Sequence, residues 1–158
     1  MVEANVTEAE RLVRDFVAWE NGDESKIDVV SESLDMYNPG LPGGEAHDRE
    51  AVADYLHESR TGFPDVRFTI EELASTGNVV LAELRVTGTH RGSFKGIPPT
   101  GRHVEFGAMA KYVVADDTVV ECHIHYDTRT LADQLGLSFP EVIGQLPKLV
   151  RGKLQTYR

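Results

Sequence analysis

The chain has 158 residues, of which 41% are hydrophobic, and a formal net charge of −10. This length suits a single domain over 1–158 that encloses a core and a ligand-sized cavity. The acidic charge, with scattered Lys and Arg, argues against nucleic acid or an anionic membrane surface as partner. The single cysteine, Cys122, excludes a disulfide within the chain, and no apolar leader follows Met1, so we expect a cytoplasmic protein.

Helices are predicted in the first part of the chain. Thr7 and Glu10 have the spacing of a capping box, and a helical stripe of apolar residues follows them. A short second helix is expected over 26–32. A third helix is expected to begin after Asp48 as its N-cap and to end before Pro64.

Strands dominate the middle of the chain. Alternating apolar and polar residues predict four strands, over 66–74, 79–89, 102–115 and 119–127. Short polar turns separate the first two and the last two, which is typical of hairpins, so the sheet is predicted to be an antiparallel meander. Further helices are expected over 128–135 and from Phe139 to Tyr157. Helices followed by paired strands indicate an α+β fold.

The last predicted strand carries the main candidate for chemistry. Its alternation places Glu121, His123, His125 and Asp127 on one face and apolar residues on the other. Four titratable groups are costly to bury in an ordinary core, so their face meets water or a polar pocket. Carboxylates and imidazoles gathered in a pocket can transfer protons near neutral pH. We therefore expect Asp127 to be a general base, with His123 or His125 as its catalytic partner.

The same residues allow other interpretations. His123, His125 and Asp127 have a His-x-His-x-Asp spacing found in some zinc hydrolases. No further His follows Asp127, and Cys122 points to the opposite face, so no metal is predicted. A solvated sheet face is the plain structural alternative. The chain has neither a phosphate-binding glycine motif nor Gly-x-Ser-x-Gly, so no cofactor and no serine nucleophile are predicted.

Several segments resemble the SnoaL-like polyketide cyclases, or ester cyclases, in order and spacing. They are Gly62-Phe63-Pro64-Asp65-Val66, the run 86–92, Gly96-Ile97-Pro98-Pro99-Thr100-Gly101, and Glu121 through Asp127 to Gln134-Leu135-Gly136. The resemblance covers about 34–136 and leaves 137–158 as a C-terminal extension. It implies a cone-shaped α+β barrel of the nuclear transport factor 2-like superfamily. In that fold, N-terminal helices pack on a curved antiparallel sheet around a deep apolar pocket.

The resemblance also implies a reaction. In the family an Asp at the position of Asp127 removes a carbon-bound proton, so that an intramolecular aldol condensation closes a ring without a cofactor. Asn38 falls where the family lines its pocket, and His123 stands where many relatives have Trp, which implies a more polar pocket here. The residues expected to contact the substrate are Tyr37, Asn38, Tyr55, Phe63, His90 and Glu121.

Two other functions stay open at this point. The same pocket could hold a small apolar molecule without converting it, as a carrier or sensor. It could also activate water, as epoxide hydrolases of the same superfamily do, with Arg85 or Arg102 as candidate helpers. In each case the expected partner is a small apolar or polyketide-like molecule. A homodimer is expected because the convex face of a bent sheet commonly carries apolar surface that needs covering.

Overall fold

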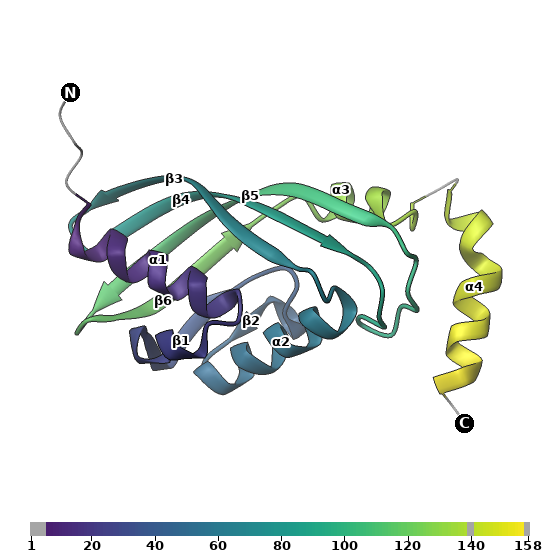
Figure 1. The fold of residues 1–158 in the computed structure, drawn as a ribbon, viewed down its shortest axis with the longest axis horizontal. Helices are drawn as coiled ribbons and strands as arrows, with labels where there is room; N and C mark the ends of the chain where they lie inside the picture. Colours follow the sequence, from purple (N-terminus) through teal and green to yellow (C-terminus); the bar gives the residue numbers. More distant parts are fainter. Residues whose placement is uncertain (1–5, 139–140, 157–158) are drawn as a thin grey trace.

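The computed structural model describes residues 6–138 and 141–156 (Figure 1). The order of elements is α1 (Glu8–Glu20), η1 (Glu24–Val29), β1 (Val30–Tyr37), η2 (Pro42–Gly44), β2 (Glu45–Ala46), α2 (Arg49–Gly62), β3 (Arg67–Thr76), β4 (Val79–Thr89), β5 (His103–Ala115), β6 (Thr118–His125), α3 (Thr128–Gln134) and α4 (Glu141–Thr156). The elements η1 and η2 are short 3-10 helices. Helices packed on a curved sheet confirm the predicted α+β class.

The predicted starts of α1 and α2 are confirmed by their caps. The Glu10 amide donates to the Thr7 hydroxyl, and the Thr7 amide donates to the Glu10 carboxylate, both at 3.2 Å. These two bonds form the capping box and satisfy donors that the first helical turn would otherwise leave free. At α2, the Asp48 carboxylate accepts from the Ala51 amide at 2.7 Å.

The sheet has six strands in the order β2-β1-β6-β5-β4-β3. The meander from β3 to β6 is antiparallel, as predicted, and Asp116 and Asp117 turn the chain between β5 and β6 with φ of 49° and 58°. β1 pairs in parallel with β6, so the sheet is mixed rather than wholly antiparallel. The sequence reading missed β1 because its start was assigned to a helix.

The helix expected over 26–32 is wrong in its extent. The helical part is η1, which ends at Val29, and the chain then becomes strand β1. In β1, Val30, Leu34 and Met36 are buried, because pairing with β6 places these side chains in the core. A long-range partner outweighed the weak local helical signal.

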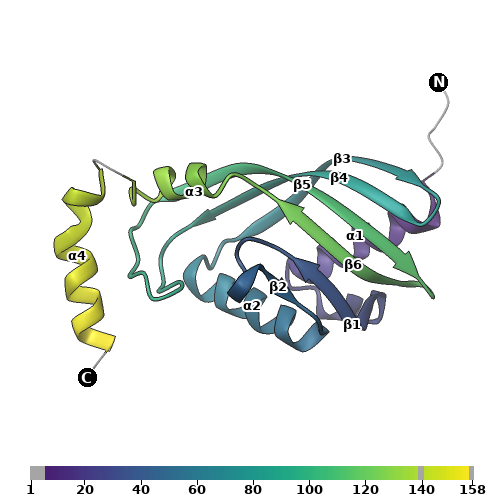
Figure 2. The same cartoon turned by 180° about the vertical axis from the view of Figure 1, so that it is seen from behind.

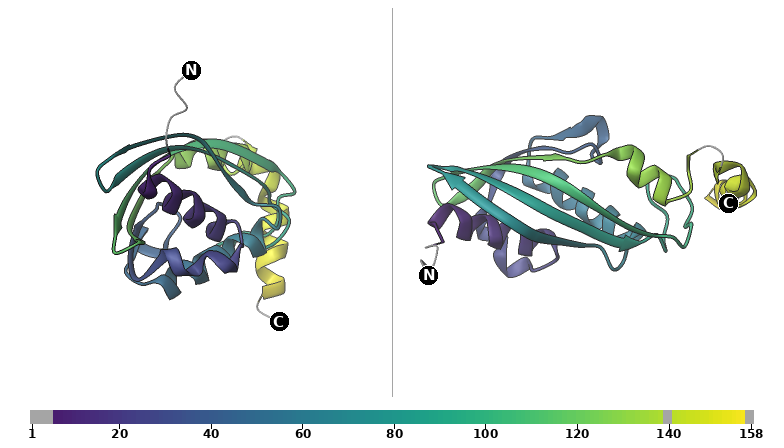
Figure 3. Two further views of the ribbon diagram at one scale, coloured as in Figure 1. Left: turned by 60° about the vertical axis from the view of Figure 1, so that its left-hand side comes forward. Right: turned by 90° about the horizontal axis from the view of Figure 1, so that it is seen from above.

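The core lies between the concave face of the sheet and the helices α1 and α2 (Figure 3). Alternate residues of β4 and β5 point into it, as their burial patterns show. The Phe16 ring of α1 packs against Trp19 and against Tyr112 of β5, with centroids 5.7 Å apart in each pair. The helices therefore cover part of the concave face and leave the remainder for a pocket.

The C-terminal part follows β6. α3 (Thr128–Gln134) matches the helix predicted over 128–135 except at Leu135, which is its C-cap, and the φ of 68° at Gly136 permits the turn that follows. α4 stands beside one end of the cone, away from α1 (Figure 2). The predicted ends of this helix at Phe139 and Tyr157 lie outside the described residues. In the described ranges, no helix is both long and apolar enough to cross a membrane.

The packing of β4 predicts a contrast between two leucines. Leu84 is 1% exposed and Leu81 is 50% exposed on the same strand. Leu84→Ala is expected to lower the free energy of unfolding by about 2–5 kcal/mol, because it empties space in a packed core. Leu81→Ala, the matched control, should cost less than about 1 kcal/mol. Urea unfolding of both variants tests this, and equal losses would contradict the inward and outward assignment of β4.

Candidate functional site

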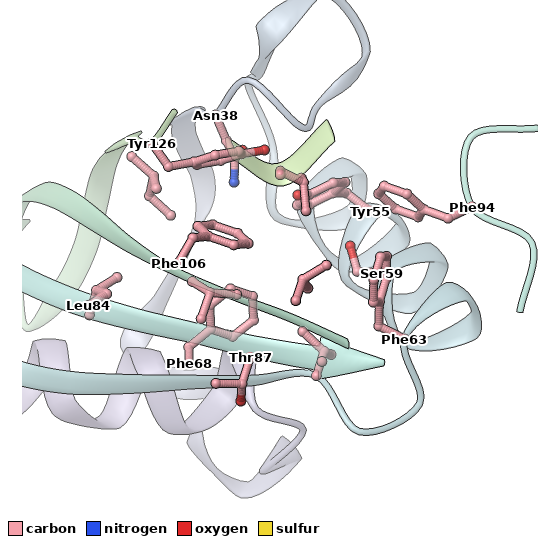
Figure 4. A pocket seen from close by; sticks show the side chains of 16 residues that line it. Asn38, Tyr55, Ser59, Phe63, Phe68, Leu84, Thr87, Phe94, Phe106 and Tyr126 are labelled. Atoms are coloured by element: carbon pink, nitrogen blue, oxygen red, sulfur yellow. The ribbon is translucent and has the colours of Figure 1, made fainter. Parts of the chain in front are cut away.

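A pocket opens on the concave side of the sheet, between α2 and the strands β3 to β6 (Figure 4). Its cavity volume is about 70 Å³. The lining residues are Asn38, Tyr55, Ser59, Phe63, Val66, Phe68, Leu84, Val86, Thr87, Gly88, Phe94, Val104, Phe106, Ile124, Tyr126 and Leu131. Small-molecule sites are commonly concave and mostly apolar, with a few polar groups, as this pocket is.

Aromatic rings form much of the pocket wall. The rings of Phe63 and Phe94 meet edge to face with centroids 5.4 Å apart, and Phe106 lies 5.0 Å from Tyr126. They come from the end of α2, the loop after β4, strand β5 and the end of β6. Such rings present flat apolar surface to a ligand. The pocket therefore favours a flat, largely apolar molecule.

A small polar group interrupts this apolar wall. Tyr55 and Ser59 are four residues apart on α2 and share one face, and Asn38 follows β1 (Figure 4). Burial strongly raises the pKa of Tyr55, the nearby Tyr126 hydroxyl raises it further, and hydrogen bonds with Ser59 and Asn38 oppose the rise. Tyr55 is thus neutral at physiological pH and keeps a proton that it can donate.

The backbone after β1 fixes this polar group. The Asn38 side-chain oxygen accepts a hydrogen bond from the Gly40 amide at 2.8 Å, which leaves the side-chain nitrogen as the group able to donate. A Cβ on Gly40 would come within 2.2 Å of the Tyr55 hydroxyl oxygen, so only glycine lets the two segments approach so closely. Asn38 is 6% exposed.

Asp127 does not lie in the pocket, and the expectation that its carboxylate faces inward is wrong. The side chain is exposed and caps α3, accepting from the Arg129 amide at 2.9 Å and from the Thr130 hydroxyl at 3.0 Å. The Thr130 hydroxyl and the two backbone amides lower the pKa of Asp127. Its neighbour Tyr126 and, one helical turn on, Leu131 both line the pocket, whereas Asp127 itself does not.

The other polar residues of β6 also lie outside the pocket, contrary to expectation. His125 is exposed, and the His123 Nε2 lies 3.4 Å from a Glu121 carboxylate oxygen on the same outer face. Tyr37 stacks on His123 there, with ring centroids 4.4 Å apart. The physical reason is that the inner face of β6 packs against the helices and lines the pocket. Cys122 and apolar residues therefore occupy that face.

His90 is buried, at 1% exposed, but it supports the pocket rather than lining it. Its ring stacks on Phe63 at 5.0 Å between centroids, and its Nδ1 accepts from the Thr100 amide at 3.2 Å. Burial lowers the pKa of His90, against a smaller raising effect from the Gly92 backbone. The neutral ring thus closes the base of the loop between β4 and β5.

Of the predicted site residues, the structure brings three to the pocket. These are Asn38, Tyr55 and Phe63. Ser59 and Tyr126 were missed, although each had a signal in the sequence: Ser59 lies one helical turn from Tyr55, and Tyr126 alternates with Ile124 on the inner face of β6. The remaining lining residues come from the inward alternation of the strands.

A buried acid lies at the end of α1, outside the pocket lining. Glu20 is 2% exposed, and its Oε2 has no hydrogen-bond partner among the described residues. Burial raises its pKa to about 8, against the opposing effect of Arg60, whose guanidinium donates to the Glu20 backbone carbonyl at 3.0 Å. Burial also raises the pKa of Tyr112 and of Cys122, with a further contribution from Glu20. Glu20 is therefore mostly protonated at pH 7.

A metal site has no support in the described ranges 6–138 and 141–156. No group of three or more His, Cys, Asp or Glu side chains there is arranged to hold a metal ion. On β6, the imidazoles of His123 and His125 lie on the solvent side of the sheet, without the closed set of ligands that zinc prefers.

The curved sheet, its covering helices and the enclosed apolar pocket define a domain with the nuclear transport factor 2-like fold. The chain belongs to the SnoaL-like polyketide cyclase family, whose model matches residues 8–135. The match includes every strand, α1, α2 and α3, and it ends before α4. A search of curated proteins found no match to the sequence.

Solved structures agree with this family. IdmH, a proposed polyketide cyclase from Streptomyces antibioticus, is 27% identical with a TM-score of 0.71, over 82% of this chain and 99% of its own. AclR, a proposed hydroxylase from Streptomyces galilaeus, is 26% identical with a TM-score of 0.68, over 83% and 97%. A proposed SnoaL-like cyclase from Jannaschia sp. has a TM-score of 0.74 at 18% identity, over 89% and 99%, which shows the shared fold.

The buried Glu20 predicts a stability that falls as pH rises. Below the usual pKa of 4.5 the carboxyl is protonated in both states, whereas between 4.5 and about 8 only the folded state keeps the proton. Over this range the free energy of unfolding should fall by up to about 1.4 kcal/mol per pH unit from this group. Glu20→Gln should remove that slope, as measured by urea unfolding from pH 5 to 9.

The control for this experiment is Glu32→Gln, which removes a carboxylate whose side chain is 90% exposed. That variant should keep the parent's slope. If Glu20→Gln keeps it as well, the buried carboxyl is not the group that binds the extra proton.

Proposed function

We propose that the protein is a cofactor-independent cyclase or isomerase that acts on a small, largely apolar carbonyl compound, by an aldol-type ring closure of a polyketide-like ester. The single observation that carries the proposal is the polar group of Tyr55, Asn38 and Ser59 set into an otherwise apolar pocket of a SnoaL-like domain. A pocket of this kind holds a carbonyl substrate by its oxygen and excludes water from the carbon that reacts.

The polar group suits the charge that such a reaction creates. Removal of a proton next to a carbonyl moves negative charge onto the carbonyl oxygen, which then needs hydrogen-bond donors. The Tyr55 hydroxyl keeps its proton because burial raises its pKa, and Asn38 has a side-chain nitrogen able to donate. In a pocket lined mainly by aromatic and aliphatic side chains, these donors act in a low dielectric, where each is worth more than in water.

Asp127 is the proposed base, on the strength of the family resemblance. Its lowered pKa keeps the carboxylate ionised at neutral pH, and two pocket residues lie close to it in the chain, Tyr126 directly before it and Leu131 one helical turn after it. To reach a bound substrate, the side chain must leave its hydrogen bonds to Arg129 and Thr130. Losing those bonds would raise its pKa and make it a stronger base at the moment of use. In this proposal the role first expected of His123 or His125 passes to the pocket donors.

Other reactions on the same fold have less support. AclR and IdmH carry different proposed activities, so the fold does not fix the chemistry. Hydrolysis of an epoxide would need carboxylates and an Arg around a water molecule. The described lining residues include neither, and Arg85 is paired with Glu71 and Glu105 on the outer face of the sheet.

A second candidate function is a carrier or sensor for a small apolar molecule. The observation in its favour is that none of the described lining residues bears a charge or an imidazole. Native mass spectrometry of the protein purified from its own cells separates the two functions. A tightly held, chemically unaltered ligand would favour the carrier, whereas turnover of an added ketone would favour the enzyme.

The homodimer and the cytoplasmic location stay predictions. The outer face of the sheet exposes Leu81 and Met109, of which Met109 is 56% exposed, and α4 exposes four more apolar side chains. These surfaces support an association between copies, because exposed apolar area is commonly covered by a partner.

The proposed base predicts a loss of exchange without a loss of fold. Asp127→Asn keeps a side chain that caps α3 about as well as Asp, so the free energy of unfolding should change by less than about 0.5 kcal/mol. Proton exchange at the α-carbon of bound α-tetralone in heavy water should fall by about 100-fold or more, followed by NMR. Asp48→Asn is the matched control, since Asp48 caps α2 in the same way and lies outside the pocket lining. Exchange at the parent rate in Asp127→Asn would remove Asp127 from the mechanism.

The proposed oxygen-binding group predicts a different kinetic signature. Tyr55→Phe should lower kcat for the same exchange by about 100-fold, with a much smaller change in KM, because the lost donor acts mainly on developing charge. Tyr112→Phe is the control: its hydroxyl is buried, has no hydrogen-bond partner among the described residues and is outside the pocket lining. That variant should exchange like the parent. A Tyr55→Phe enzyme with unchanged kcat would show that the hydroxyl does not stabilise the intermediate.

A further inference from the structure

The loop between β4 and β5 forms one side of the pocket mouth. We call residues 91–101 the mouth loop. It contributes Phe94 to the pocket lining, and the Phe94 ring lies against Phe63. It also packs on Gly62 so closely that a Cβ there would come within 2.6 Å of the Phe94 Cβ. The position of Phe94 therefore sets the width of the mouth on this side.

The mouth loop is held at its base by backbone hydrogen bonds. The amides of Arg91 and Gly92 both donate to the Gly62 carbonyl at 3.0 Å, and the Gly101 amide donates to the His90 carbonyl at 2.8 Å. These bonds fix the two ends of the loop to α2 and to each other.

The tip of the loop is a tight turn of its own. Phe94 and Ile97 exchange two backbone hydrogen bonds, of 3.0 and 2.8 Å, across Lys95 and Gly96. Those two residues have φ of 50° and 72°, in the left-handed region. Phe94 is therefore part of this turn, and a contact that fixes the turn also fixes the position of the Phe94 ring in the pocket.

The far side of the tip lies against α4. A Cβ built on Gly152 would lie 2.1 Å from the Pro98 Cγ and 2.5 Å from its Cβ, so backbone and proline ring are in direct contact. Around this contact, a shallow hollow is lined by Gly96, Ile97, Pro98, Leu137, Leu149, Val150 and Lys153. The helix and the tip thus share a small apolar interface.

α4 is in turn fastened to the body of the domain. The buried Gln145 donates from its side-chain nitrogen to the Leu135 carbonyl at 2.8 Å and to the Gly136 carbonyl at 3.1 Å. Gln145 makes both bonds from the second turn of α4, whereas Gly152 lies two turns further along. The helix therefore bridges the end of α3 and the tip of the mouth loop.

This bridge lies outside the part of the chain that defines the family. The family model ends at residue 135, and IdmH matches 99% of its own length while covering 82% of this chain. We propose that α4 is a strut that holds the mouth loop and Phe94 in place and thereby controls how fast ligands of a given size enter and leave the pocket. Gly152 is the positioning residue at the contact. The inference rests on the pocket of the proposed function, but not on the reaction.

Two glycines of the same helix allow a matched test. Gly152→Ala places a methyl group where the Pro98 ring now lies, and a proline ring cannot turn aside as a flexible side chain can. Gly144→Ala adds the same methyl group where no atom lies within 4 Å. Both changes raise the helix propensity of α4 by a similar amount, so a difference between them reports the contact with the loop.

Amide hydrogen exchange in the full chain is the first measurement. In Gly152→Ala the Phe94 and Ile97 amides should exchange about tenfold faster than in the parent, a change of about 1.4 kcal/mol in local opening free energy. The amides of β4 and β5 should not change, and Gly144→Ala should match the parent throughout. Equal exchange at the tip in the two variants would overturn the strut, whatever the pocket binds.

Dissociation of prodan, a neutral fluorescent ketone, is the second measurement. Stopped-flow release should be several-fold faster from Gly152→Ala than from Gly144→Ala, with the pocket lining unchanged in sequence. Faster exchange at the tip with identical release rates would show that the strut does not control access, and would overturn that part of the proposal. Neither measurement requires catalysis, so failure of the cyclase assignment and failure of the strut give different results.

Discussion

The need to cover the concave face of the curved sheet governs this protein. In a curved sheet, every second side chain of a strand points to the concave face. Those side chains must be apolar and covered. α1 fills one part with Phe16 and Trp19, and α2 fills another with Val52 and Leu56. The remaining part, between α2 and the strands β3 to β6, is not filled by side chains, and it forms the pocket. The binding site is therefore the unfilled part of the core rather than a cleft added to the surface.

The same constraint explains why polar groups in the pocket are few and fixed. A hydroxyl or amide in an apolar cavity is costly unless it has a partner. Tyr55 therefore hydrogen-bonds with Ser59 and Asn38, and Asn38 also accepts from the Gly40 amide. Glu20 has no such partner for its Oε2 among the described residues, and burial raises its pKa so that it keeps its proton. The groups that affect stability and the groups proposed for the chemistry thus lie in the same buried interior, where pKa values depart furthest from their usual range.

Asp127 shows how a residue can be in the family's position and yet serve structure in the absence of a substrate. Its carboxylate accepts hydrogen bonds in the first turn of α3, and such an N-cap stabilises a helix. Tyr126, directly before it, and Leu131, one helical turn after it, belong to the pocket wall. The C-terminal helix α4 adds a second element at the same mouth, beyond the segment matched by the family model.

The helices α1 and α2, the capping box at Thr7 and the hairpins of the meander could be predicted from the sequence, because caps, turns and alternation act over a few residues. The two faces of β6 were also evident, since alternation separates His123 from Ile124. Which face turns inward was not, because that depends on the helices that pack across the sheet. Strand β1 and the approach of Gly40 to Tyr55 could not be predicted either, because both depend on contacts with distant segments. Local chemistry determined the elements, and only contacts between distant segments decided where the pocket lies.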